Sequence, residues 1–425
     1  MAVTLLFLSL ALFLVLNVPV GIALGFSAIV AIIFSSTSLT LLSLTQSLVT
    51  SCDSFPILAI PMFILAGDLM SAGGVSSRIL KVCNIFFGRV TGGLAIVTVL
   101  VCMFFAAVSG SGPATVAAVG TMVIPTMLRQ GYSKGFCLSL VATAGAIGVI
   151  IPPSIPMVIF GVSTGTSVTE LFMAGLIPGI IIGISLIIYC YYHCKKYGIK
   201  GEGERPTLKE ALKAIYDAKW ALINPIIILG GIYAGIFTPT EAASVAALYA
   251  FICGCFFHRE LTLKKLFNAI STSCSTTATT MVILGCASAF TKIIMVEQIP
   301  AMITQSFLSI SSNGIVLLIL INILLLIVGC IMDTTPAILV LAPILLPIAK
   351  AIGLDPVHFG IIMVVNLAIG FTTPPLGINL FVASRISNSP MEVILKGIVP
   401  FLLVMLVNLA LVSFIPSISM FIPNL

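Results

Sequence analysis

The stretches Ser109-Gly-Ser-Gly-Pro113 and Asp333-Thr-Thr-Pro336 each interrupt an apolar run that is too long for one membrane crossing. The runs cover residues 92–128 and 314–349, whereas about 20 apolar residues are enough to cross a hydrocarbon core of about 30 Å. A polar break near the middle of such a run is expected where the chain turns back to the side it came from. The two stretches therefore predict two re-entrant helical hairpins.

The rest of the chain also has the composition of a membrane protein. Of its 425 residues, 60% are hydrophobic and 8% are charged, and the mean hydropathy is +1.26. A soluble domain has about 25% charged residues, so a soluble fold could not hide this much apolar surface. We expect an all-α polytopic membrane protein with ten full crossings, at residues 2–18, 20–36, 55–73, 136–164, 172–193, 220–237, 239–257, 267–291, 357–386 and 392–416.

The basic residues indicate orientation and not nucleic-acid binding, although the net charge is +6. Segment 194–219 is the most hydrophilic part of the chain and holds seven of its 19 Lys and Arg residues. Basic connecting segments face the cytoplasm, so we expect a cytoplasmic linker here. The capping box Thr207-Leu-Lys-Glu210 predicts that a short amphipathic helix begins in it. Counting crossings outward places both termini on the periplasmic side of a bacterial inner membrane.

The two halves of the chain repeat one pattern. Pro113 and Pro125 of the first hairpin match Pro336 and Pro347 of the second, at offsets of 223 and 222 residues. Five crossings per half is an odd number, so the second half should be inserted upside down. The predicted organisation is a first inverted repeat over 1–193, the linker over 194–219, and a second inverted repeat over 220–425.

A second matching pair interrupts a crossing helix in each half. Gly148-Val-Ile-Ile-Pro-Pro153 lies in the run 136–164, and Gly370-Phe-Thr-Thr-Pro-Pro375 lies in the run 357–386. Lipid cannot satisfy the backbone groups that such breaks release, so these groups must line a cavity or bind a ligand. Inverted repeats with interrupted helices at matching positions are typical of secondary transporters, whose site lies near the midplane.

These interruptions predict the kind of site. Helix N-termini favour anions, and free carbonyl oxygens suit hard cations. We expect two Na⁺ sites related by the repeat, each built from one hairpin tip and one interrupted helix. Arg129 and Arg385 lie only at span ends, so a substrate carboxylate would be held by helix N-termini, hydroxyls and bound cations. The alternative is purely structural, with Ser111 or Gly112 and Asp333 as helix caps and the prolines as kinks.

At these motifs the chain resembles the large permease, or M subunit, of tripartite ATP-independent periplasmic (TRAP) transporters. The resembling stretches run in family order over nearly the whole chain. They are Pro61-Met-Phe-Ile-Leu-Ala-Gly67, Ser109 to Gly120, Gly148 to Pro156, Gly235 to Ala243, Asp333-Thr-Thr-Pro336 and Phe371 to Gly377.

The resemblance implies an elevator mechanism driven by a Na⁺ gradient, without ATP and without enzymatic activity. It implies two partners, a small four-helix Q membrane subunit and a periplasmic substrate-binding protein P. Substrates of the family are organic acids, and the chain looks closest to the sialic acid (N-acetylneuraminate) branch, with C4-dicarboxylates as the alternative.

The resemblance also implies the site residues. The substrate site would be lined by Ser109, Ser111, Ser154, Asp333 and the adjacent Thr334. The two Na⁺ sites would be formed by Ser111, Gly148, Ile151, Pro153, Thr335, Gly370, Thr373 and Leu376.

Three other classes of protein remain as alternatives. A stand-alone divalent-anion/Na⁺ symporter shares hairpins of this kind, but its hairpin tips would read Ser-Asn-Thr. An intramembrane enzyme would need a catalytic constellation at span depth, and Asp333 has no second acidic residue near it in the sequence. A passive channel fits inverted hairpins at the midplane less well than alternating access does.

Overall fold

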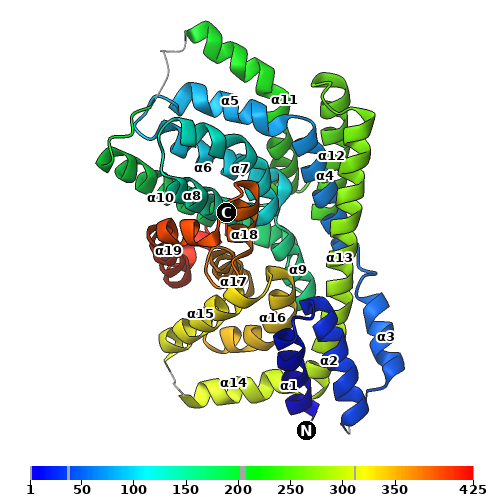
Figure 1. Cartoon of the computed structure of the whole chain (residues 1–425). Helices are drawn as coiled ribbons and strands as arrows, with labels where there is room; N and C mark the ends of the chain where they lie inside the picture. Colours follow the sequence, from blue (N-terminus) through cyan, green and yellow to red (C-terminus); the bar gives the residue numbers. More distant parts are fainter. Residues whose placement is uncertain (1, 36–38, 202–206, 311–312, 425) are drawn as a thin grey trace.

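The computed structural model describes residues 2–35, 39–201, 207–310 and 313–424, and within these ranges it contains helices and no strand (Figure 1). The all-α prediction is confirmed. Eight of the helices in this part of the chain are long and apolar enough to cross a membrane: Phe55–Ala72, Val168–Lys196, Lys209–Tyr233, Pro239–Phe257, Leu263–Val296, Gly314–Ile331, Thr334–Ala351 and Met391–Phe414. How these and the shorter apolar helices sit in a bilayer stays a prediction.

The helices fall into two series of similar order. The first series is α1 (Ala2–Val15), α2 (Val20–Phe34), α3 (Leu41–Thr50), α4 (Ala59–Ala72), α5 (Val75–Phe87), α6 (Gly93–Ser109), α7 (Gly112–Arg129), α8 (Lys134–Ala146), α9 (Ile155–Thr164) and α10 (Val168–Lys196). The second series is α11 (Leu208–Tyr233), α12 (Pro239–Ile252), α13 (Leu263–Val296), α14 (Ile299–Ile310), α15 (Gly314–Ile331), α16 (Thr334–Ala351), α17 (Pro356–Gly370), α18 (Ile378–Ile386), α19 (Met391–Phe414) and α20 (Pro416–Met420).

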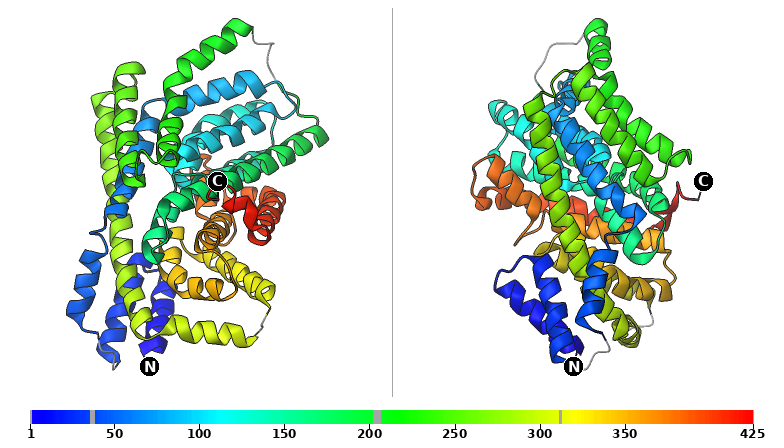
Figure 2. Two further views of the ribbon diagram at one scale, coloured as in Figure 1. Left: turned by 180° about the vertical axis from the view of Figure 1, so that it is seen from behind. Right: turned by 90° about the vertical axis from the view of Figure 1, so that its right-hand side faces the viewer.

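The two series interlock, because helices of each half pack on helices of the other half in equivalent pairs. Helix α2 of the first half packs on α13 of the second, and α12 of the second half packs on α4 of the first. In the same way α9 packs on α16, and α18 packs on α7. The left view of Figure 2 shows the long α13 running along one side of the molecule. This exchange is the packing expected of two inverted repeats.

Each predicted hairpin is a pair of helices joined by a tight break. In hairpin 1 (α6 and α7), Gly110 has a left-handed backbone with φ of 61°, which glycine adopts without steric cost. Ser111 then caps α7, and its Oγ accepts the N–H of Ala114 at 3.5 Å. In hairpin 2 (α15 and α16), Met332 is extended and Asp333 caps α16. The local chemistry of both tips is therefore that of a helix start.

Both interrupted helices lie where the sequence predicted them. Helix α8 ends at Ala146, and a short 3₁₀ turn (Ile147–Val149) and irregular chain lead to α9. Helix α17 ends at Gly370, and irregular chain leads to α18. The bond between the paired prolines is cis in both segments.

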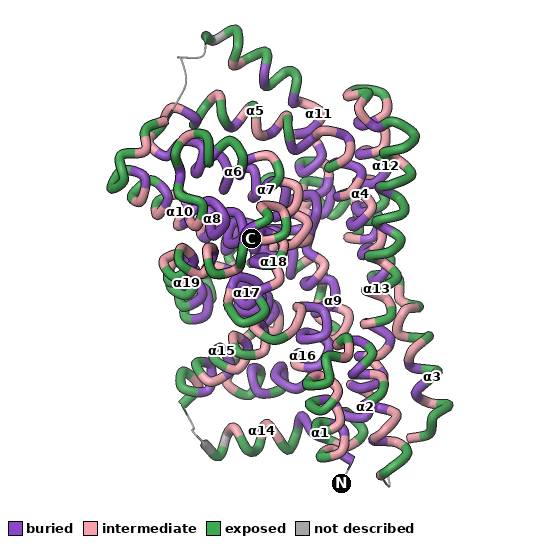
Figure 3. Tube along the Cα trace, in the orientation of Figure 1, coloured by how far each residue is buried: buried purple, intermediate pink, exposed green. Residues whose placement is uncertain are grey.

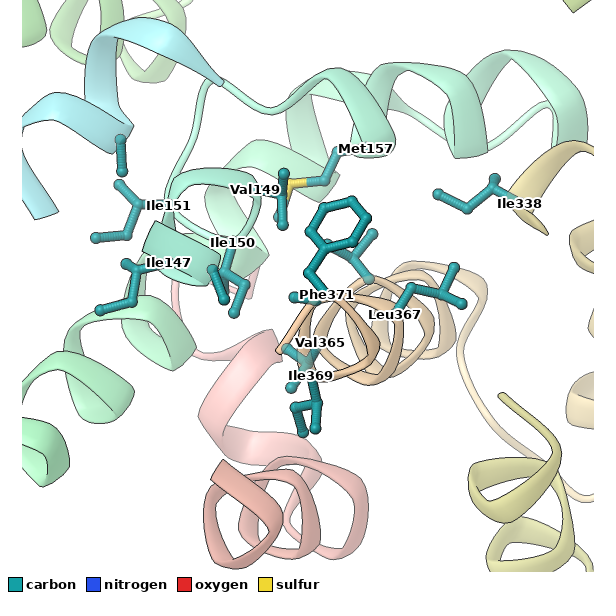
Figure 4. Packing of buried hydrophobic residues seen from close by; sticks show 14 of the residues in the cluster. Ile147, Val149, Ile150, Ile151, Met157, Ile338, Val365, Leu367, Ile369 and Phe371 are labelled. Carbon is teal, nitrogen blue, oxygen red and sulfur yellow. The ribbon is translucent and has the colours of Figure 1, made fainter. Parts of the chain in front are cut away.

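The molecule is most deeply buried around these two interrupted helices. Every residue of α17 from Val357 to Gly370 is buried, whereas α3 and α14 lie at the periphery with exposed faces (Figure 3). Figure 4 shows Val149, Ile150 and Met157 of the first interrupted segment beside Leu367 and Phe371 of the second. The apolar core therefore fixes the two breaks against each other.

Several helices and one helix length differ from the sequence prediction, within the part of the chain that the structure describes. Helix α3, and the helices α5 and α14 that precede the two hairpins, were not among the expected elements. The capping box at Thr207 does begin a helix, with Glu210 Oε2 accepting the Thr207 N–H at 2.9 Å. That helix does not stop within the linker, because α11 continues to Tyr233. Residues 202–206 of the linker lie outside the described residues.

One end of the molecule collects basic residues. Figure 1 shows α5 and the start of α11 at the top, far from α1 and α14. Arg78 of α5 forms an ion pair of 2.7 Å with Glu260, in the connection that leads to α13. Lys264 and Lys292 lie near opposite ends of α13, about 40 Å apart at about 1.5 Å per residue. Arg78 and Lys264 therefore lie at a different level of the molecule from Lys292.

Candidate functional site

The tips of the two hairpins line one cavity of about 450 Å³. Of the residues predicted for the site, Ser109, Ser111, Asp333, Thr334 and Thr335 line it. The remaining walls come from α4, α13, the start of α7, both ends of the first interrupted segment and Phe371 of the second. The structure thus brings together two tips that are more than 200 residues apart in the chain.

A hydroxyl network holds the tip of hairpin 1. The Ser109 and Thr115 hydroxyl oxygens lie 3.1 Å apart, and the Thr115 hydroxyl donates to the Ser111 carbonyl oxygen at 2.8 Å. Ser109 and Thr115 are buried, whereas Ser111 is partly exposed. Ser111 is therefore the hydroxyl of this network that a bound molecule can reach most readily.

Asp333 both caps α16 and lines the cavity. Its Oδ1 accepts the N–H of Thr334 at 2.6 Å and lies 3.3 Å from the Thr334 hydroxyl. The residue is half-buried. It also borders a second cavity of about 470 Å³ between α2, α13 and α16. Hence the carboxylate lies at a junction between two hollow regions, which a cap alone does not require.

Ser154 is placed differently from the prediction. It is fully buried and is not among the residues that line the cavity, although its neighbours Ile155 and Pro156 are. Its hydroxyl donates to the Val149 carbonyl at 2.6 Å, and its Oγ accepts the N–H of Met157 at 3.4 Å. Ser154 therefore closes the interrupted segment and caps α9, with its hydroxyl already engaged.

In the first half, the hairpin tip meets the interrupted segment through backbone atoms. The Gly110 carbonyl accepts the N–H of Ile155 at 3.3 Å. A Cβ added to Gly148 would lie 2.7 Å from the Ser111 carbonyl oxygen, so only glycine allows this approach. Pro153 lies at the same contact, since its carbonyl oxygen would be 2.8 Å from a Cβ on Gly110. Several carbonyl oxygens therefore gather at the place predicted for the first Na⁺.

The second half makes an equivalent contact. A Cβ on Gly370 would lie 2.4 Å from the Gly329 carbonyl oxygen, so the end of α15 touches the end of α17 through two glycines. The Leu376 N–H donates to the Cys330 carbonyl at 3.3 Å, and the Thr373 hydroxyl donates to the Ile369 carbonyl at 2.8 Å. The residues predicted for the second Na⁺ thus lie on one joint between hairpin 2 and its interrupted helix.

Apart from Ser111 and Thr335, the residues predicted for the two Na⁺ sites lie beside the cavity and not on its surface. The residues Gly148, Ile151, Pro153, Gly370, Thr373 and Leu376 are not among those that line it. No group of three or more His, Cys, Asp or Glu that could hold a metal ion occurs in the described part of the chain. A cation at these joints would therefore be bound by carbonyl and hydroxyl oxygens, which are the ligands that hard cations prefer.

The part of the cavity wall formed by α4 and α13 is a polar surface that the sequence reasoning missed. Asp68 of α4 lines the cavity, and its Oδ2 accepts the hydroxyl of Ser273 at 2.7 Å. Thr272, Thr276 and Thr280 of α13 line the same wall. Their spacing of four residues places them on one helix face. This spacing within the long apolar run 267–291 is the signal that could have revealed them.

The chemistry of the cavity follows from its charges. Among the described residues that line it, the charged groups are Asp68 and Asp333, and none is Lys or Arg. The other polar groups are serine and threonine hydroxyls and the N-termini of α7 and α16. An anion that entered would meet two carboxylates, so its binding here requires compensating cations or protons.

Two interlocked inverted repeats, whose hairpin tips meet in a polar cavity within apolar helices, define the architecture of a multi-pass membrane transporter. Residues 7–418 match the family described as "Tripartite ATP-independent periplasmic transporter, DctM component", and the chain belongs to this family. The resemblance inferred from the motifs is confirmed. The chain is therefore the large permease component of a tripartite transporter and not an enzyme.

Relatives of the chain differ in the substrates for which they are named. It is 49% identical over 411 residues to an isethionate TRAP transporter permease, DctMQ, of Oleidesulfovibrio alaskensis, covering 97% of this chain and 65% of that relative. It is 42% identical over 403 residues to the C4-dicarboxylate large permease DctM of Pseudomonas aeruginosa, covering 95% and 94%. It is 37% identical over 410 residues to the sialic acid large permease SiaM of Vibrio cholerae, covering 96% and 95%.

A solved structure shares the fold. The YdaH transporter of Alcanivorax borkumensis aligns with a TM-score of 0.63, covering 96% of this chain and 97% of that chain. The sequence identity is 15%, so this similarity concerns the arrangement of helices alone.

Proposed function

We propose that this chain is the membrane permease of a Na⁺-driven importer that moves a small organic anion across the bacterial inner membrane by an elevator movement of the hairpins. The observation that carries the proposal is the meeting of both hairpin tips in one cavity whose charged lining residues are acidic. Such a cavity favours an anion only when cations bind with it. Carbonyl oxygens at the two joints beside it supply the ligand type that Na⁺ requires.

Two partners belong to this proposal. A periplasmic binding protein would deliver the substrate, as the tripartite family description implies. A small Q membrane subunit would complete the membrane part. The isethionate relative is named DctMQ, and this chain spans 65% of its length. With both termini of the permease on the periplasmic side, the basic end of the molecule would face the cytoplasm.

The substrate class is a small carboxylate or sulfonate. Isethionate is the first candidate, because the relative named for it is 49% identical to this chain. C4-dicarboxylates are the second, with relatives at 40% and 42%. Sialic acid, which the motif resemblance favours, stays a prediction, since the relative named for it is 37% identical. A cavity of about 450 Å³ lies within the range of ordinary small-molecule sites.

The test is uptake into proteoliposomes that contain the chain and its Q subunit. Radiolabelled isethionate, succinate and sialic acid are compared, each with its binding protein and a Na⁺ gradient present or absent. Uptake of one of these acids only when both are present supports the proposal and identifies the substrate. Uptake without a binding protein would instead support a stand-alone symporter, and uptake without Na⁺ would contradict Na⁺ coupling.

A further inference from the structure

A larger cavity, of about 910 Å³, lies away from the hairpin tips. It is formed where the C-terminal end of α10 meets the N-terminal turns of α8 and α19, which pack against one another (Figure 1). None of the described residues that line it also lines the central cavity. It therefore has no part in the proposed substrate site.

The lining of this cavity combines basic and aromatic side chains. Its polar surface includes Lys196, Lys396, His193, Tyr189, Tyr192 and Tyr197. Among the described lining residues there is no Asp or Glu to neutralise the two lysines. Both lysines are exposed, so their ammonium groups can turn into the cavity without a burial cost. A ligand that fits this surface carries negative charge.

The position of the cavity along α10 points to the edge of the bilayer. This apolar helix ends in Tyr189-Cys-Tyr-Tyr-His-Cys-Lys-Lys196, and Tyr192 and Tyr197 remain 66% and 64% exposed. Tyrosine gathers where apolar helices reach the headgroup region, and lysine extends its ammonium group toward water there. This sequence at the end of α10 predicts that the cavity lies at the level of lipid headgroups.

Two helix ends add partial positive charge at the same place. Helices α8 and α19 both begin beside the cavity, which Ser133 and Val393 help to line. Helix N-termini favour negative groups by their dipoles. Close packing fixes this arrangement, because a Cβ on Gly135 would lie 2.8 Å from the Val393 carbonyl oxygen.

We propose that this cavity binds the phosphate headgroup of an anionic phospholipid, with Lys196 and Lys396 beside the phosphate and the tyrosines at headgroup depth. Basic pockets between membrane helices are the recognised form of such sites. A free phosphate ion carries negative charge as the lipid headgroup does, but it has no acyl chains. The lipid is favoured because the exposed tyrosines flank the pocket at the end of an apolar helix.

The test measures binding of phosphatidylglycerol to the purified full-length chain in detergent, by native mass spectrometry during a lipid titration. The double variant K196Q/K396Q should bind about 30-fold more weakly, at about fivefold per lysine. The variant K196R/K396R keeps the charge and should bind as the wild type does. The control K209Q/K213Q removes the same charge from exposed positions of α11 outside the cavity and should change binding less than twofold.

Two comparisons distinguish an anionic lipid from a free phosphate ion as the ligand. Phosphatidylcholine, which has no net charge, should bind at least tenfold more weakly than phosphatidylglycerol, and inorganic phosphate should not displace bound phosphatidylglycerol. Equal binding of the two lipids would overturn the proposal. Displacement by inorganic phosphate would assign the cavity to a small soluble anion, and unchanged binding in K196Q/K396Q would show that the lysines are not the site.

Discussion

Asp333 has two roles that can be separated by mutation. Its carboxylate caps α16, and the residue also lines the central cavity. Replacement by alanine removes both and should cost about 1 kcal/mol of stability through the lost cap. Replacement by asparagine keeps a good cap but removes the charge. We therefore expect D333A and D333N both to abolish Na⁺-driven uptake, and only D333A to lower the thermal unfolding midpoint. Wild-type uptake by D333N would show that Asp333 is a cap and nothing more.

Asp68 is the second acidic group of the cavity, and it offers a test of charge compensation. Asp68→Asn removes a negative charge while keeping an oxygen that can accept the Ser273 hydroxyl. Because cations bind more weakly where the local charge is less negative, the Na⁺ concentration for half-maximal uptake should rise several-fold.

The matched control for this effect is Ser273→Ala, which removes the hydrogen bond and leaves the carboxylate in place. It should leave the Na⁺ dependence close to that of the wild type. The same shift in both variants would assign the effect to the hydrogen bond and not to the charge.

Among the elements, the joint between hairpin 2 and α17 depends on two glycines in backbone contact. A Cβ on Gly370 would lie 2.3 Å from the Gly329 carbonyl carbon, and backbone cannot move aside as a side chain does. Overpacking of this kind costs about 1–3 kcal/mol, and we expect Gly370→Ala to reach the upper end of that range. A lower thermal unfolding midpoint of the purified protein is the measurement.

Gly230→Ala is the control substitution. It lies inside α11, and nothing lies within 4 Å of the added Cβ. This change should leave the unfolding midpoint unchanged or raise it, because alanine favours a helix by roughly 0.5–1 kcal/mol over glycine. Equal destabilisation by the two substitutions would contradict the account of the joint.

A pH dependence is expected at the connection between α12 and α13, outside the apolar spans. Burial, and then the nearby Arg78 guanidinium, lower the pKa of His258, whose Nδ1 lies 3.0 Å from the Gly73 carbonyl oxygen. The unfolded chain takes up a proton at a higher pH than the folded chain does. Stability from this group is therefore present above the unfolded pKa of about 6.5 and is lost as the pH falls below it.

The measurement is the thermal unfolding midpoint of the wild type and of His258→Gln at about pH 7.5 and about pH 5.5. The wild type should lose more stability over this interval than the variant, whose side-chain amide can still donate to Gly73. An identical loss in both proteins would remove His258 from the explanation.

At the scale of the whole molecule, the proposed elevator movement requires hairpin 1 to slide along α4. In this structure the two touch, because a Cβ on Gly67 would lie 3.3 Å from the Cβ of Ser109. A disulfide joins Cβ atoms about 3.5–4.5 Å apart, so the pair G67C/S109C should cross-link after a small adjustment. Oxidation should then stop uptake, and a reductant should restore the level of the reduced double variant.

The background for this experiment is Cys274→Ser, which removes an exposed thiol. Each single cysteine variant is the control for oxidation without a cross-link. Uptake that continues at the reduced rate after complete cross-linking would show that hairpin 1 and α4 do not move apart during transport.

The class of the protein and the places where its helices break could both be predicted from the residues alone. The hairpin tips and both interrupted segments were predicted because glycine, proline and capping residues act on the backbone within a few residues of themselves. The repeated pattern and the long apolar runs predicted the membrane architecture. The length and hydropathy of a segment can be read from the sequence without knowing how the helices pack.

Which side chains share the cavity could not be predicted from the sequence, because it depends on packing between distant helices. Asp68 and the threonines of α13 reach it because packing places α4 and α13 side by side, about 200 residues apart in the chain. Ser154 carries the predicted hydroxyl, but the turn it closes uses that hydroxyl internally. Buried hydroxyl groups bond to an available acceptor, and for Ser154 that acceptor, the Val149 carbonyl, lies within the same interrupted segment.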